Sequence, residues 1–179
     1  MFGRVVFGCV LVDALVLRPH GITGSSNGRQ RRLIGMRAQE LDTNPNAHRH
    51  TFVVDHADID EFGHANNVVW VRWINDAALA HACEVGLGPD ACNALGCVWV
   101  VRRHDIEYLL PAFIGQTLEA TTWPETVRGA SSLRRTIFRR EGRVLARAAT
   151  TWVLVSLASD KPRRVPREMM TAYSFDPDA

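Results

Sequence analysis

The chain has 179 residues, of which 46% are hydrophobic and 22% are charged, as in an ordinary soluble globular protein. Its formal net charge of +2 excludes a strongly basic nucleic-acid binder, and the basic excess lies in residues 1–50, which hold seven arginines and three acidic residues. A chain of this length favours one domain whose hydrophobic core needs no disulfide staples.

The N-terminal part differs in composition from the rest. Residues 5–17 are apolar apart from Asp13, and this stretch is too short to cross a bilayer as a helix. Residues 21–32 are mostly Gly, Ser, Asn and Arg, which is typical of a linker. We therefore expect residues 1–48 to form a poorly ordered extension, and we expect no membrane span.

The next segments predict a strand followed by a long helix. Residues 49–58 alternate in the manner of a strand. Residues 68–85 are apolar around most of a helical circumference, so this helix is expected to have protein on several sides. Gly86 and Pro89 are typical of a helix end.

Four further strands are predicted downstream. Residues 97–110 are expected to stop at Pro111, and residues 116–123 at Pro124. Residues 131–140 and 143–157 flank Glu141-Gly142, which predicts a tight antiparallel hairpin. Residues 49–160 thus form the predicted domain, and residues 161–179 form a tail with a short helix near residues 167–173.

One buried helix and about five strands joined by short links predict an α+β fold, in which a curved antiparallel sheet wraps a long central helix. Such a sheet keeps an exposed edge, which a second copy commonly covers, so a homodimer or homotetramer is expected. The four cysteines lack the spacing of a metal knuckle and are expected to be reduced; they are Cys9, Cys83, Cys92 and Cys97. Cys83 is expected to be a small core residue. We expect the protein to be cytoplasmic.

The segment Asp58-Ile-Asp-Glu-Phe-Gly-His-Ala-Asn-Asn67 gathers acids, an imidazole and amides directly before the predicted helix. Such groups are costly to bury unless they are used, which favours a functional site. The alternative is a polar turn in which Asn67 caps the helix. Asp58 and Asp60 share parity, so Asp58 would raise the pKa of Asp60 if the strand persisted; otherwise Asp58 faces solvent.

With Trp70 and Trp73 following it, this segment resembles the opening motif of the hot-dog-fold acyl-CoA thioesterases of the 4-hydroxybenzoyl-CoA thioesterase type. The run from His104 to Leu118, with its Tyr, Pro and Gly, is similar to the family's next recurring segment. The resemblance covers residues 50–156. Trp70 stands where the family often has Tyr, and Ala65 where it often has Val.

The resemblance implies that the chain hydrolyses an acyl-CoA thioester with Asp60 as nucleophile or general base. It implies that amides near His64 hold the thioester oxygen, and we expect no cofactor. A carboxylate is ionised at neutral pH and a thiol leaves without strong acid help, which suits this chemistry. The candidate catalytic residues are Asp60, Gly63, His64, Asn66 and Asn67.

The candidate substrate-binding residues are Trp70, Trp73, Arg128, Gly129 and Ser131. The resemblance points to Arg128 and Gly129 as a contact for the coenzyme A phosphates, although neighbouring strand arginines alternate in direction and favour a solvated surface. No aromatic stacking platform lies among these arginines, so no nucleic-acid partner is expected.

Other interpretations of the same residues stay open. Asp58, Asp60 and His64 form a weaker candidate metal site, and no metal is expected. Asp76 is a rival catalytic acid, although a helical ion pair with Arg72 explains it more simply. At the level of function, the alternatives are a non-catalytic acyl-CoA- or acyl-carrier-binding domain, a thioesterase for acyl carrier protein, or a dehydratase.

Overall fold

The computed structural model describes residues 44 and 46–176, so the predictions for residues 1–43 lie outside the described residues. The elements are β1 (His48–Val53), η2 (His56–Asp58), α1 (Asn67–Glu84), α2 (Pro89–Ala94), β2 (Cys97–Tyr108), β3 (Thr117–Arg128), β4 (Ser131–Arg140), β5 (Arg143–Ser156) and α3 (Arg167–Ala172). Within the described part, none of the helices has the length and apolar character that a membrane crossing requires.

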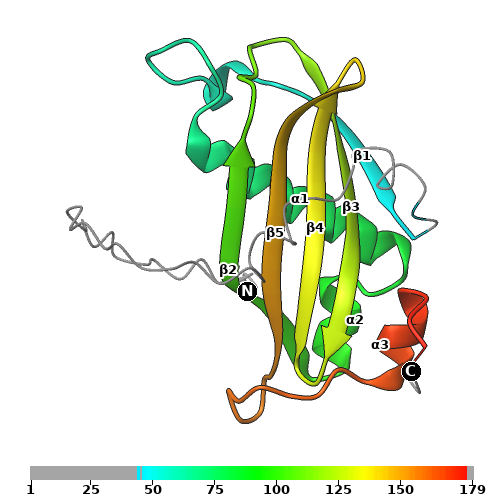
Figure 1. Ribbon diagram of the computed structural model, residues 1–179. Coiled ribbons are helices and arrows are strands. Elements are labelled where there is room, and N and C mark those ends of the chain that lie inside the picture. The colour runs from blue at the N-terminus through cyan, green and yellow to red at the C-terminus, as the bar shows by residue number, and fades with distance from the viewer. Residues whose placement is uncertain (1–43, 45, 177–179) are drawn as a thin grey trace, which may run out of the picture. The chain divides into compact units, whose positions relative to one another are not determined.

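The five strands form one sheet in the order β1-β3-β4-β5-β2, and all neighbours are antiparallel. The long helix α1 crosses one face of this sheet, as Figure 1 shows, and packs on β1 and β3. The predicted α+β architecture with a central helix and five antiparallel strands is confirmed. β1 and β2 are the two edges.

The predicted hairpin between β4 and β5 is also confirmed. Its two turn residues, Glu141 and Gly142, have φ angles of 48° and 76°. Two successive positive φ values characterise the tight turn whose twist matches that of the flanking strands. Local sequence chemistry is therefore sufficient to define this end of the sheet.

The predicted first strand extends too far along the chain. β1 ends at Val53, and η2 follows because Asp55 caps a short 3-10 turn. The Asp55 carboxylate accepts a hydrogen bond from the Ala57 amide at 3.1 Å, and the Asp58 carboxylate accepts one from the Asp55 amide at 3.0 Å. This reciprocal cap ends the extended backbone before the polar segment begins.

Pro124 lies inside β3 and does not stop it, contrary to the prediction. β1 pairs with β3 only as far as Thr122, so Pro124 lies beyond the end of that neighbour. The ladder to β4 shifts register between Pro124 and Thr126. A missing backbone donor is tolerated where a strand is irregular or lacks a neighbour.

The core between α1 and the sheet is aromatic and aliphatic. It consists of Val54, Ala65, Trp70, Trp73, Ile74, Ala77, Ala112, Leu118, Ala120, Phe138, Leu145, Ala146 and Ala148. Only one side of α1 is buried in this way, since Val68 is 74% and Leu79 38% exposed. The Cys83 side chain is on the exposed side, so its prediction as a core residue is wrong.

A second, smaller core involves α2, α3 and the ends of β2 and β5. Its buried members are Leu87, Cys92, Cys97, Leu154, Val165 and Met169. Val165 and Met169 belong to the predicted tail, and the predicted short helix is present as α3. The tail therefore packs on the end of the sheet, while the division at residue 160 stays a prediction.

Candidate active site

The polar segment before α1 is a closed turn. Ile59 and Ala65 form an isolated antiparallel bridge, and the Asp60 amide donates to the His64 carbonyl at 2.9 Å. Gly63 closes the turn with a φ of +82°, a backbone region that is strained for residues with a side chain. The Ala65 amide donates to the Ala112 carbonyl at 2.8 Å, which attaches the turn to the segment after β2.

Asp58 is a buried structural residue of this turn. It is 2% exposed and forms an ion pair with Arg72 on α1. Its carbonyl accepts a hydrogen bond from the Asn66 amide at 2.9 Å. The predictions that Asp58 shares a strand face with Asp60 or faces solvent are both wrong, because β1 has already ended and Arg72 holds the carboxylate inside.

Arg72 also contacts Asp76 at 4.0 Å, in line with the simpler interpretation of Asp76 as part of a helical ion pair. Because the carboxylate of Asp58 is held by Arg72, it is committed to a partner other than Asp60 and His64. Among residues 46–176, no group of three or more His, Cys, Asp or Glu side chains is arranged to hold a metal.

Asp60 and His64 lie together on the turn. Asp60 Oδ1 lies 3.7 Å from His64 Nδ1, and the side chains are 23% and 45% exposed. Asp60 Oδ1 also accepts a hydrogen bond from the Phe62 amide at 2.9 Å. No described residue donates to Oδ2, which leaves one carboxylate oxygen available for chemistry.

The start of α1 supplies backbone donors beside this pair. Asn66 is the helix cap, since its side chain accepts from the Val68 amide at 2.9 Å. Asn67 is the first residue of the helix, so the prediction that Asn67 is the cap is wrong by one position. The amides of His64 and Asn67 donate to no acceptor within the described residues. The Asn67 amide belongs to the first turn of α1 and carries the positive end of the helix dipole, whereas the His64 amide comes from the preceding turn.

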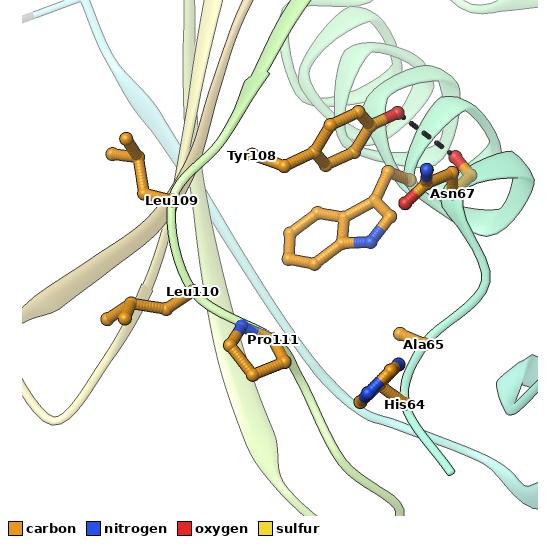
Figure 2. Close-up of a pocket in the computed structure, with 8 residues that line it drawn as sticks. His64, Ala65, Asn67, Tyr108, Leu109, Leu110 and Pro111 are labelled. Atoms are coloured by element: carbon orange, nitrogen blue, oxygen red, sulfur yellow. Dashed lines mark hydrogen bonds between the residues drawn. The ribbon is translucent and has the colours of Figure 1, made fainter. Parts of the chain in front are cut away.

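A pocket of about 220 Å³ opens beside these amides. It is lined by His64, Ala65, Asn67, Trp70, Tyr108, Leu109, Leu110 and Pro111. Figure 2 shows the turn residues on one side and Leu109, Leu110 and Pro111, which follow β2, on the other. Asp60 reaches this pocket through its neighbour His64 and does not line it. The pocket therefore combines a polar rim with an apolar wall.

Tyr108 is the site residue that the candidate list lacks. Its hydroxyl donates to the carbonyl of Asn67 at 3.2 Å, the dashed line in Figure 2. Burial raises the pKa of Tyr108, so the phenol stays protonated and keeps this donor role. The signal in the sequence was its position near the end of the strand predicted before Pro111, but only the fold shows that this strand end lies against the helix.

The two predicted tryptophans are both buried, but they face different spaces. Trp70 is 2% exposed and lines the pocket beside Asn67. Trp73 is 3% exposed and lines a second pocket of about 180 Å³ with Arg72 and Asp76. The Trp70 indole therefore adjoins the candidate chemistry, and that of Trp73 does not line the same pocket.

Arg128, Gly129 and Ser131 lie at the other end of the sheet. Tyr108 pairs across the sheet through Ala146 and Phe138 with Ala120, which marks the level of the α1 start. Arg128 is eight residues further along β3, a distance of about 26 Å at 3.3 Å per residue. The described chain thus does not bring the predicted coenzyme A contacts to Asp60, and their role stays a prediction.

Comparison with known proteins places this geometry in a family. Residues 45–173 match the family model for the acyl-ACP thioesterase N-terminal domain. No curated protein matches the chain. Because the match spans most of the chain, it covers the turn, α1 and all five strands.

Solved structures share the fold at low sequence identity. A DHNA-CoA thioesterase from Staphylococcus aureus is 19% identical with a TM-score of 0.67, and the alignment covers 72% of this chain and 89% of that one. The probable thioesterase YbaW from Escherichia coli is 22% identical with a TM-score of 0.61, over 69% and 94% of the two chains.

An acyl-ACP thioesterase from Bacteroides thetaiotaomicron is 22% identical with a TM-score of 0.63, over 67% of this chain and 50% of that one. The chain thus spans half the length of that relative, whereas it spans most of the two shorter thioesterases. With the family match over residues 45–173, these likenesses in fold lead to one assignment: the chain belongs to the acyl-ACP thioesterase family of hot-dog-fold thioesterases.

Proposed function

We propose that this protein hydrolyses an acyl-CoA thioester to a free carboxylic acid and coenzyme A. The observation that carries the proposal is the proximity of three groups beside one pocket with an apolar wall. His64 and Asn67 line the pocket with an imidazole ring and an unpaired backbone amide, and the Asp60 carboxylate, with one free oxygen, lies 3.7 Å from Nδ1 of His64. Family membership supports thioester hydrolysis as the reaction class.

In the proposed reaction, Asp60 attacks the thioester carbon or removes a proton from the attacking water. The carbonyl oxygen becomes an oxyanion, and the amides of Asn67 and His64 are the donors proposed to stabilise it. The tetrahedral species collapses by expelling a thiolate, whose thiol has an ordinary pKa of about 8.5 and needs little acid assistance. If Asp60 attacks directly, water then cleaves the acyl-enzyme anhydride.

His64 and Tyr108 have supporting roles in this proposal. His64 lies between Asp60 and the pocket, where it can orient the carboxylate or the water. The Tyr108 hydroxyl holds the Asn67 carbonyl and so fixes the first turn of α1, from which the oxyanion donor comes. Gly63 permits the backbone turn that brings Asp60 and His64 together.

Acyl carrier protein is the second candidate carrier of the acyl group, and the family match over residues 45–173 favours it. Both carriers present the acyl group on a phosphopantetheine thiol, so the reacting atoms are the same. An assay with matched acyl-CoA and acyl-carrier substrates distinguishes them through the ratio of their kcat/KM values.

We propose that a second chain supplies Arg128, Gly129 and Ser131 if these residues contact the same substrate as Asp60. About 26 Å of strand separates the two regions within one chain. We therefore retain the homodimer or homotetramer as part of the proposal, with the exposed edges β1 and β2 as candidate contact strands.

The central test is the substitution Asp60→Ala, with thiol release from acyl-CoA as the measurement. Loss of a general base or nucleophile predicts a fall in kcat of about 10²-fold or more. Glu61→Ala is the matched control, since Glu61 is the adjacent, exposed carboxylate. Asp60→Asn should behave as Asp60→Ala does while preserving the shape of the side chain.

Full activity of both Asp60 variants would contradict the assigned role. Tight acyl-CoA binding without thiol release by the unaltered protein would instead favour the non-catalytic binding domain. The two results can be distinguished, because thiol release persists in the first case and is absent in the second.

A further inference from the structure

Trp70 lines the candidate acyl pocket and is almost completely buried. Its indole packs edge-on against Trp73 and Phe138, with ring centroids 5.0 Å and 5.2 Å away, and against Tyr108 at 5.9 Å. It is 2% exposed, yet it lines the pocket that contains His64 and Asn67. One side of the ring therefore faces the pocket and the other faces the core.

We propose that Trp70 determines specificity for acyl length by closing the pocket with its indole, so that the unaltered protein prefers short acyl groups. This inference rests on the proposed function, since it assigns the pocket to the acyl group. The apolar residues Leu109, Leu110 and Pro111 form the wall along which such a group would lie.

The residues behind Trp70 determine what its removal would create. Phe138 is fully buried on β4, and Phe52 on β1 lies within 4.9 Å of Trp73, centroid to centroid. These rings belong to the layer between α1 and the sheet. Truncation of Trp70 would join the pocket to that layer and extend it with apolar surface, which accommodates hydrocarbon better than water.

The test is a series of acyl-CoA thioesters from butanoyl to dodecanoyl, compared between the unaltered protein and Trp70→Ala. The ratio of kcat/KM for decanoyl-CoA to that for butanoyl-CoA should rise at least about tenfold in the variant, since even one methylene in an apolar pocket has an effect of that order. Trp70→Leu, which leaves a smaller void, should shift the optimum less.

Ile74→Ala is the matched control. Ile74 is on the same helix and fully buried, and it lines neither of the two pockets. Its truncation should lower stability to a similar degree and leave the chain-length ratio unchanged. If the effect came from a general loosening of the core, the decanoyl-to-butanoyl ratio of kcat/KM would rise in both variants. This result would overturn the inference.

Binding of non-hydrolysable S-alkyl-CoA thioethers, measured by calorimetry, keeps the inference testable if turnover is absent. Longer alkyl groups should bind to Trp70→Ala or Trp70→Leu more tightly than to the unaltered protein. The same length preference in all proteins, or no binding to any of them, would overturn the inference. Absence of turnover alone would contradict the proposed function. The binding measurement would then decide whether Trp70 determines specificity for acyl length.

Discussion

Asp58 makes three contacts that hold the turn before α1. Its buried carboxylate pairs with Arg72 on α1 and accepts a hydrogen bond from the Asp55 amide, and its backbone carbonyl accepts one from the Asn66 amide. The turn that carries Asp60 is thereby attached to α1 independently of Asp60 itself. Asp58 is accordingly a structural residue of this turn, and Arg72 is its counter-ion.

Replacement of Arg72 by Met is expected to destabilise the fold by about 1–3 kcal/mol, because it leaves the buried Asp58 carboxylate without its charged partner. Urea unfolding measures the loss. Asp76→Asn is the control: it removes the exposed partner of the same arginine, and such pairs contribute about 0.5 kcal/mol or less. Equal losses in the two variants would contradict a special role for Asp58.

Sequence reasoning grouped Asp60 with His64, and their catalytic roles stay a prediction, whereas the residues that support their turn were not predicted. Asp60 and His64 are four residues apart and meet because a single turn contains both. Arg72 is fourteen residues from Asp58, and their contact depends on the angle at which α1 leaves the turn. No local sequence pattern specifies that angle, so the burial of Asp58 and its ion pair with Arg72 could not be predicted.

The first turn of α1 distinguishes two adjacent asparagines. Asn66 caps the helix through its side chain, while Asn67 contributes its carbonyl to Tyr108 and leaves its amide unpaired. Asn66→Ala is therefore expected to reduce the free energy of unfolding by about 1 kcal/mol.

Asn67→Ala should have a much smaller effect on stability, since both of its described roles belong to the backbone. Urea denaturation of the two variants gives the comparison. A larger loss for Asn67→Ala would show that the cap is misassigned by one residue. Asn66→Asp, which keeps a capping oxygen, should retain most of the stability.

Individual elements were predictable where residues adjacent in the sequence determine the backbone conformation. Glu141 and Gly142 specify a tight turn without contacts from distant parts of the chain. Pro124 was misjudged because its tolerance depends on β1, a strand more than seventy residues earlier whose pairing ends at Thr122. The strand-to-helix link at Asp55 was missed because a reciprocal side-chain cap competes with the extended backbone.

A buried polar network connects α1, β1, β4 and the C-terminal segment at the scale of the whole domain. His81 is 5% exposed and contacts the Arg134 guanidinium at 3.1 Å, and its ring stacks with that of His48 at 5.4 Å. The Tyr173 ring packs on both His81 and Arg134. The burial of His81 depends on these partners, which are distant in the sequence.

Burial, followed by the positive charge of Arg134 and the neighbouring His48, lowers the pKa of His81 from 6.5 to about 4, while Glu84 opposes the shift. Above pH 6.5 the ring is neutral in both folded and unfolded chains, so it contributes no pH dependence. Between pH 6.5 and 4 only the unfolded chain takes up the proton, so stability falls as pH falls, by about 3 kcal/mol in all.

Urea midpoints measured from pH 7.5 to 4.5 test this linkage. His81→Gln keeps a hydrogen-bond acceptor for Arg134 and should flatten much of the slope. His104, whose pKa burial also lowers, is expected to leave a residual dependence. His56→Gln alters an exposed ring and should leave the slope as it is; an unchanged slope in His81→Gln would contradict the assignment.

The separation of Arg128 from Asp60 along β3 determines how variants at these two positions would behave when they are mixed. If the two residues serve one substrate from two different chains, each complete centre contains Asp60 of one chain and Arg128 of the other. A variant at Asp60 would lack turnover, and a variant at Arg128 would bind the substrate more weakly. Mixed pairs of the two variants would contain one intact centre, so the two defective chains would complement each other in the same solution.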